Sequence, residues 1–178
     1  MKKILLLVFL SCIIVRAQEK WSTKKAVITF EASVPFFEPI QATNKTVSCL
    51  LNVKKSSIAF VVNIKDFRFE RSLMERHFNE NYLESRKYPR AVFKGSIENF
   101  ELTTLNSTAV LYMIVGTITI HGKSKKIVVP GSFTKTGKVV ELKTSFDLLT
   151  DDFDISIPFL VKDKIAKNVH VNLNARLE

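Results

Sequence analysis

The sequence predicts an all-β protein: a long antiparallel sheet that is closed or folded back on itself, with one short helix. The first observation is that apolar and polar residues alternate with a period of two over most of the chain. This alternation is typical of strands whose two faces meet different surroundings. The second is that the strand segments follow one another without crossover helices, which favours antiparallel pairing. A helical spacing of apolar residues occurs only over about 72–85.

The chain begins with MKKILLLVFLSCIIVRAQEK, which has the pattern of a secretory signal peptide. Two lysines precede an apolar run from Ile4 to Val15, and the small-residue rule favours cleavage after Ala17. The run is too short to span a bilayer, which takes roughly 20 residues. A lipoprotein acylated at Cys12 is the less favoured alternative, because the apolar run continues past that cysteine. We therefore expect a periplasmic or secreted protein.

The remainder, 18–178, is expected to form a single domain after a signal peptide at 1–17. The formal net charge of the full chain is +10, which is compatible with an anionic head group or with peripheral contact with an anionic membrane. The basic residues are scattered, and no arginine-rich block or nucleic-acid motif occurs. The sequence therefore predicts no nucleic-acid partner.

Strand patterns recur along this domain. They occur at 25–33, 45–53, 57–65, 91–99, 110–120, 125–134, 138–147, 153–159 and 169–177. The last segment is the clearest, because Val169, Val171 and Leu173 share one face while His170 and Asn172 share the other. Glycines are few, so most connections are expected to be short polar turns such as Thr136-Gly137.

The helix predicted at 72–85 has one apolar stripe. Met74, Phe78 and Tyr82 follow one another at intervals of four residues, so they lie on one face of a helix. Such a short amphipathic helix is expected to plug the sheet or pack against it.

Both ends of this helix carry sequence signals. Ser72 followed by Glu75 fits a capping box at the N-terminus. At the other end Tyr88-Pro89 stops the helix, because a residue before proline avoids the helical region. A strand is expected to follow directly.

No residue pattern indicates catalysis, a metal site or a cofactor. His77 lacks a histidine four residues away on either side, since those positions are leucine and asparagine, and a zinc site needs three or four clustered ligands. His121 is expected in a turn and His170 on a solvated strand face. Cys49 lies within a strand pattern and is expected to be a buried, inert thiol.

The chain is unusually rich in phenylalanine, with 14 residues against 3 tyrosines and 1 tryptophan. These rings either pack a filled core or line a barrel that is left partly open. A barrel of about eight strands is wide enough for either arrangement, and composition does not choose between them.

Three stretches carry a resemblance to a known family. ERSLMERHFNENYLESRKYPRAVFKGSI contains Tyr88-Pro89 and Phe93-Lys94, and VGTITIHGKSKKIVVPGSF contains 118–122 and Val129-Pro130. LVKDKIAKNVHVNL then leads into the last strand. In this order and spacing the stretches resemble the YceI-like family, and the resemblance covers nearly the whole chain after the signal peptide.

The resemblance implies an extended, eight-stranded, antiparallel, lipocalin-like barrel with an apolar tunnel. It implies a tunnel that holds a polyisoprenoid or another lipid-like amphiphile, in a periplasmic or secreted setting, without catalysis. From the alternation we expect the tunnel to be lined by Phe60, Val62, Phe67, Phe69, Met74, Phe78, Tyr82, Phe93, Tyr112, Ile114, Ile118, Phe153 and Ile157. The candidate contacts for a polar head group are Arg76, His77, Arg86 and Lys94.

Two other classes of function are open at this point. The barrel could act through its outer surface, as an inhibitor or stress-related partner of an envelope protein. It could also be a lipid-modifying enzyme, which would need a reactive group inside the tunnel, and Cys49, His77 and His121 are the candidates for that role.

Overall fold

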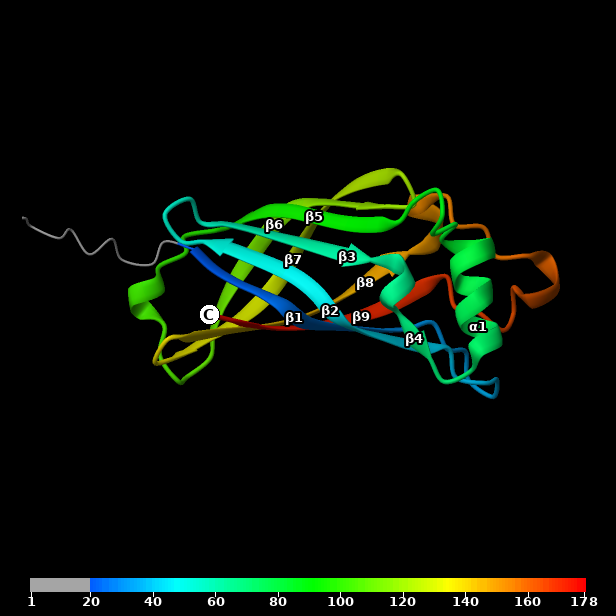
Figure 1. The fold of residues 1–178 in the computed structure, drawn as a ribbon, viewed down its shortest axis with the longest axis horizontal. Helices are drawn as coiled ribbons and strands as arrows, with labels where there is room; N and C mark the ends of the chain where they lie inside the picture. Colours follow the sequence, from blue (N-terminus) through cyan, green and yellow to red (C-terminus); the bar gives the residue numbers. More distant parts are fainter. Residues whose placement is uncertain (1–19) are drawn as a thin grey trace, which may run out of the picture.

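Eight long strands close into an antiparallel barrel in the computed structural model, which describes residues 20–178 (Figure 1). The long strands are β1 (Lys20–Glu31), β2 (Gln41–Asn52), β3 (Ser57–Asn63), β5 (Arg90–Ile97), β6 (Val110–Ile120), β7 (Lys123–Thr136), β8 (Val139–Leu149) and β9 (Asn168–Leu177). Around the barrel their order is β1-β9-β8-β7-β6-β5-β3-β2, and pairing of β1 with β2 closes it. The two-residue strand β4 (Arg68–Phe69) pairs with the start of β2. The predicted eight-stranded, lipocalin-like barrel is confirmed.

The expected signal peptide and the alternative at Cys12 lie outside the described residues. Within 20–178, no helix has the length and apolar character needed to cross a membrane.

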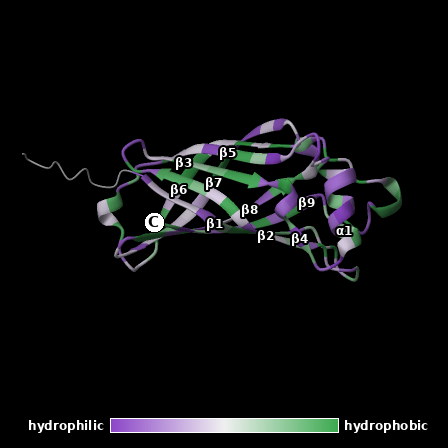
Figure 2. Cartoon of the chain, viewed as in Figure 1, coloured by the Kyte–Doolittle hydropathy of each residue, from purple (hydrophilic) through white to green (hydrophobic). Residues whose placement is uncertain are grey.

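The period-two alternation decides which side chains face the barrel interior. In β9 the side chains of Val171, Leu173, Ala175 and Leu177 are buried, while those between them are exposed. Figure 2 shows apolar residues recurring along the strands, whereas helix α1 is largely hydrophilic. The core is therefore a single column of side chains that runs along the axis of the barrel.

The segment 153–159, predicted as a strand, is not one. It lies in the connection between β8 and β9, which contains the short 3-10 turns η4 (Thr150–Phe153) and η5 (Phe159–Val161). The flanking strands β8 and β9 already pair with each other along their length, from the pair Val140 and Leu177 to the pair Leu149 and Asn168. No neighbour is therefore left for a further strand between them. Asp154 also takes a left-handed conformation with φ 52°, which ends the regular backbone.

The helix begins at the predicted residue, Ser72, but its N-terminal capping and its C-terminal end differ from the prediction. Helix α1 (Ser72–His77) has Arg71 at its N-cap position, and no side chain caps it. The predicted capping box is therefore wrong. The Glu75 carboxylate instead accepts hydrogen bonds from the Phe69 backbone N–H at 3.3 Å and from the Arg68 guanidinium at 3.1 Å. It thereby ties the helix to β4.

The helix ends before residue 85. After α1 the chain continues as the π-helical turn η2 (Phe78–Tyr82), in which the Leu83 N–H donates to the Phe78 carbonyl at 2.9 Å. Glu84 then takes a left-handed conformation with φ 43° and stops the helix. The proline after Tyr88 thus acts on the start of β5 rather than on the end of the helix.

Candidate apolar binding cavity

A cavity of about 520 Å³ occupies the end of the barrel where α1 lies. Its wall combines inward-facing strand residues with α1, η2 and the loops that join β1 to β2 and β8 to β9. The lining residues are Ile28, Phe30, Ala32, Phe37, Glu38, Ile40, Val62, Ile64, Phe67, Phe69, Met74, His77, Phe78, Tyr82, Leu83, Ala91, Ile118, Ile120, Phe146, Leu148, Leu149, Thr150, Phe153, Ile155, Ile157, Val161, Lys164, Ile165, Ala166, Val169 and Val171.

One wall of the cavity is a cluster of four phenylalanine rings. Phe30 lies 5.2 Å from Phe67, 5.8 Å from Phe69 and 5.4 Å from Phe78, measured between ring centroids. Phe78 comes from η2 and also packs on Phe67 at 5.5 Å and on Phe69 at 5.1 Å. The helical segment therefore does not fill the barrel. It supplies one ring to an aromatic wall and leaves free space beside it.

Polar side chains are few and lie mostly at the rim. Apart from Glu38, His77, Thr150 and Lys164, every lining side chain is apolar or aromatic. Glu38 forms an ion pair with Arg71. The Thr150 hydroxyl is buried and has no hydrogen-bond partner. Burial raises the pKa of Tyr82, which keeps its phenol neutral in the cavity wall.

Nine of the residues predicted to line a tunnel do lie around this cavity. They are Val62, Phe67, Phe69, Met74, Phe78, Tyr82, Ile118, Phe153 and Ile157. The last two do so although their segment is a loop, because the alternation of apolar residues still separates an inner side from an outer one.

Four predicted lining residues face the interior but do not reach the cavity: Phe60, Phe93, Tyr112 and Ile114. The ring of Phe93 reaches close to Gly95 and Gly116. A Cβ at those positions would come within 2.7 Å and 2.5 Å of its Cζ atom, so the two glycines leave room for the ring. Phe60 packs on it at 6.3 Å.

The other two belong to the filled end of the barrel. Tyr112 lies 5.2 Å from Phe100 and 5.8 Å from Phe133, again between ring centroids. Ile114 is buried nearby, where its Cδ1 atom approaches Gly131. These side chains are core rather than cavity wall, because they pack among other buried side chains at this level.

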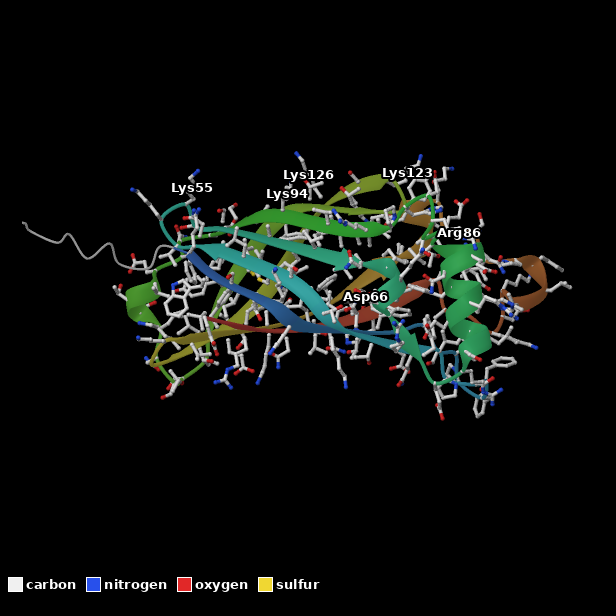
Figure 3. All side chains as sticks on the ribbon, in the orientation of Figure 1. Lys55, Asp66, Arg86, Lys94, Lys123 and Lys126 are labelled. Atoms are coloured by element: carbon white, nitrogen blue, oxygen red, sulfur yellow. The ribbon has the colours of Figure 1, made fainter. Side chains whose placement is uncertain are left out.

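The expected head-group contacts divide in a similar way. His77 lines the cavity, whereas Arg76, Arg86 and Lys94 do not. Lys94 follows the inward-facing Phe93 in β5, so the alternation places it on the outer surface, and Figure 3 shows it there. Arg76 and Arg86 are exposed, Arg86 beyond the end of the helix. Lys164 takes a rim position that the sequence did not suggest.

The missed lining residues are of two kinds. Some alternate along strands, as Ile28 and Phe30 do in β1, and this pattern could have identified them; others of this kind are Ile120, Phe146, Leu148, Val169 and Val171. Phe37, Ile40 and Ile165 lie in loops without periodicity, where no sequence signal separates an inner side from an outer one.

His121 joins three segments that surround the cavity. Its Nε2 atom lies 2.7 Å from Glu84 Oε2, and its Nδ1 atom lies 3.0 Å from the Phe153 carbonyl oxygen. A carbonyl oxygen only accepts, so Nδ1 carries a proton and donates it to the Phe153 carbonyl. The hydrogen bond between Nε2 and the Glu84 carboxylate then needs a second proton, shared between those two atoms. Tyr88 packs against the imidazole edge to face at 4.6 Å. The β6–β7 turn thereby holds both the end of the helix and the start of the β8–β9 loop.

Cys49, the remaining reactive candidate, and His170, expected on a solvated strand face, lie away from the cavity. Cys49 is buried in β2, and burial raises the pKa of its thiol. His170 is exposed on β9, where its hydrogen bond to Asp147 lowers the pKa of that carboxyl. Among residues 20–178, no three histidine, cysteine or acidic side chains lie close enough together to hold a metal ion.

A closed antiparallel β-barrel with an apolar cavity at one end defines the class of lipocalin-like barrels. Comparison with known proteins places the chain within that class. A family model for the YceI-like domain matches residues 20–177. The chain therefore belongs to the YceI-like family, and the predicted resemblance is confirmed.

Solved structures show the same fold. A polyisoprenoid binding domain from Saccharophagus degradans, implicated in plant cell wall breakdown, matches with a TM-score of 0.80 and 12% identity, over 90% of this chain and 98% of that one. Burkholderia cenocepacia BcnA matches with a TM-score of 0.71 and 15% identity, over 86% and 96%. A Campylobacter jejuni YCEI protein matches with a TM-score of 0.53 and 16% identity, over 87% and 83%. No curated protein matches the chain.

Proposed function

We propose that this protein binds one apolar chain, such as a polyisoprenoid or another lipid-like amphiphile, in the barrel cavity and carries it without chemical change. The observation that carries the proposal is the cavity of about 520 Å³ with an almost wholly apolar lining. This volume lies in the range of roughly 300–1,000 Å³ that is typical of small-molecule sites. The polyisoprenoid binding domain with the same fold supports this ligand class.

Burial of the chain supplies the binding energy. Each CH₂ group moved from water into an apolar site contributes about 0.8 kcal/mol. Association costs on the order of 4–15 kcal/mol in lost freedom. Several isoprene units therefore offset that cost without special chemistry, and the polar groups at the rim, Glu38, His77 and Lys164, are available for a head group.

The chemistry of the lining supports binding rather than turnover. The titratable side chains that line it are Glu38, His77, Tyr82 and Lys164. Glu38 is paired with Arg71, and burial keeps Tyr82 protonated. Of the three reactive candidates, Cys49 and His121 lie outside the lining, and His77 lies within it. We further propose a periplasmic or secreted location, which the signal-like pattern of the first 17 residues supports.

The test is extraction of the full-length protein, purified from a bacterial periplasm, with organic solvent. Mass spectrometry of the extract beside native mass spectrometry of the protein should show a prenyl or acyl species in a stoichiometric amount. The matched variant is Ala91→Trp, which places a large ring in the cavity and should carry little or none. A wild-type protein that is empty and does not take up added polyprenol would contradict the proposal.

A second candidate function is action through the outer surface. Leu111 and Met113 of β6 and Val128 of β7 are exposed on adjacent strands, outside the barrel. Surface apolar residues on neighbouring strands are a common feature of protein interfaces. An empty cavity together with a protein partner that is lost in Leu111→Ser, but kept in Ala91→Trp, would favour this function over the carrier.

A further inference from the structure

Two loops at the cavity end expose large apolar side chains to solvent. Phe36, in the β1–β2 loop, is 106% exposed, and Phe159 and Leu160, in the β8–β9 loop, are 77% and 89% exposed. The loops are joined at their bases, where the Ala166 N–H donates to the Ala32 carbonyl at 2.9 Å. Figure 1 shows both loops at the end of the barrel that α1 covers. The three side chains thus lie on two joined loops at the same end of the molecule, although they come from distant parts of the sequence.

This feature flanks the place where the cavity reaches the surface. The residues that line the cavity and are also exposed mark its mouth: Phe37, Glu38, His77, Leu149 and Lys164. Phe36 and Phe159 are direct or near neighbours of these residues but do not line the cavity themselves. Their rings serve neither the core nor the ligand site. Phe36 also keeps a left-handed backbone with φ 70°, which is uncommon for a bulky residue.

Lysines accompany the exposed rings. The Lys162 ammonium lies 4.2 Å from the centroid of the Phe159 ring, and that of Lys164 lies 6.0 Å from the Phe37 ring. The sequence PFLVKDKIAK at 158–167 holds three lysines against one aspartate, Asp163. Apolar side chains that enter a lipid interface, with lysines whose stems lie along them and whose charges reach the phosphates, are the usual composition of a peripheral membrane contact.

We propose that this mouth tip, defined as Phe36, Phe159, Leu160 and Lys162, docks onto an anionic lipid bilayer, so that the cavity opens onto the membrane that holds its ligand. The proposal rests on the proposed function, because a lipid-like ligand is what gives the mouth a reason to face a membrane. Three protruding side chains on two narrow loops suit insertion among head groups. They do not form the broad surface of roughly 800 Å² per partner that a standard protein interface buries.

The position of the tip also fits this orientation. Lys20, where β1 begins, lies at the opposite end of the barrel from α1 and the two loops (Figure 1). A barrel that stands on its mouth therefore keeps the start of β1 away from the bilayer. The cavity end of the barrel, rather than its side, would contact the membrane, with the long axis of the barrel pointing away from the bilayer.

The experiment measures flotation of the full-length protein with vesicles of phosphatidylcholine, with and without phosphatidylglycerol. The tip variant is Phe36→Ser/Phe159→Ser/Leu160→Ser. The matched control is Leu111→Ser/Met113→Ser/Val128→Ser, which removes three exposed apolar side chains from the outer face of the sheet. Uptake of a fluorescent polyprenol in solution, without vesicles, is measured for every protein, because none of these six residues lines the cavity.

The wild type and the control should float with phosphatidylglycerol vesicles. The partition coefficient of the tip variant should be lower by a factor of roughly ten or more, because it loses three inserting side chains. Lys162→Gln should weaken partitioning roughly fivefold at low salt and much less at high salt. All four proteins should take up the polyprenol equally in solution.

Other outcomes separate the two proposals. A wild type that takes up polyprenol but does not float, or a tip variant that floats as well as the control, overturns the docking proposal and leaves the binding function standing. A protein that floats through its tip but takes up no polyprenol supports docking and contradicts the carrier. Equal losses in the tip variant and the control would assign the contact to general surface hydrophobicity and overturn the proposal.

Discussion

The two ends of this barrel use the same kind of residue to opposite effect. At the filled end Phe100, Tyr112 and Phe133 meet with ring centroids 5.2–5.8 Å apart and pack within the buried core. At the cavity end Phe30, Phe67, Phe69 and Phe78 pack just as closely, at 5.1–5.8 Å, but on one wall. A space of about 520 Å³ remains beside them. Aromatic content therefore does not decide whether a barrel is filled.

The difference comes from what faces the rings. At the filled end Gly131 leaves room for its neighbours, because a Cβ there would lie 2.7 Å from Ile114 Cδ1 and 3.0 Å from Phe133 Cε2. The rings of Tyr112 and Phe133, from the neighbouring strands β6 and β7, can therefore pack on each other beside Gly131. At the cavity end η2 and the loops cover the barrel from outside, and Phe78 joins the wall rather than the axis. Closure by backbone segments leaves the interior unfilled.

The largest expected effect is the loss of a ring from the filled end. Phe133→Ala should lower the free energy of unfolding by about 3–5 kcal/mol, because Phe133 is completely buried and its removal leaves a void. Phe78→Ala should cost clearly less, because its ring already borders free space. Denaturant unfolding measures both, and equal losses would show that the two ends are packed alike.

The opposite change, from small to large, should sharpen the contrast. Ala175→Leu, in the fully buried part of β9, should cost about 1–3 kcal/mol through overpacking. Ala91→Leu adds the same atoms but directs them into the cavity, so its unfolding free energy should change little. Chemical denaturation of the pair is the measurement. A large loss in Ala91→Leu would mean that the cavity end cannot accept added volume.

The stability of the segments that cover the cavity end, the helical segment 72–85 and the start of the β8–β9 loop, should depend on His121. His121→Asn keeps a residue that tolerates the left-handed backbone at φ 50° but removes the bridge between Glu84 and the Phe153 carbonyl. We expect a loss of about 1–2 kcal/mol and faster amide exchange in 72–85 and 150–157.

His170→Asn is the control for this change. His170 also contacts a carboxylate, at 2.7 Å from Asp147, but it is exposed. Little or no change in stability is expected for this solvent-screened surface pair. Equal effects of the two substitutions would argue against a bridge that holds the covering segments.

The buried hydroxyl of the cavity wall should be dispensable. Thr150 Oγ1 has no hydrogen-bond partner, so Thr150→Val, which keeps the shape, should leave stability unchanged or raise it by up to about 1 kcal/mol. Thr144→Val is the comparison, because Thr144 Oγ1 donates to the Pro130 carbonyl at 2.7 Å. That variant should lose stability in thermal unfolding, and a loss in Thr150→Val would reveal a partner for its hydroxyl.

The smallest effect is a pH dependence on the outer surface. The hydrogen bonds from His170 and Asn168 lower the pKa of Asp147 below its ordinary value of 3.8. A carboxyl with a lowered folded pKa stabilises the protein above the unfolded value, and the contribution disappears as pH falls through the folded pKa. Asp147→Asn should therefore flatten the acid limb of stability against pH slightly. An unchanged acid limb would mean that solvent screens these contacts completely.

Much of the architecture was predictable because the alternation is local. It identifies the strands and their inner faces, and it even places Phe153 and Ile157 toward the interior although their segment is a loop. The same rule would have kept Lys94 out of the head-group set, since Phe93 beside it faces inward. The missing capping box and the early end of the helix at Glu84 were not predictable, because backbone geometry at single residues overrode a generic motif.

The sequence by itself determined which side chains face inward, because a period of two assigns each strand residue to one face of the sheet. It also determined the family, through motifs spread over the chain. Only the tertiary structure decided where along the axis the barrel is filled. That depends on which rings from different strands reach the same level, as Phe60 and Phe93 do below the cavity, and on loops such as those of Phe37 and Lys164 that fold over its end. Register and loop placement are long-range properties, which no local pattern records.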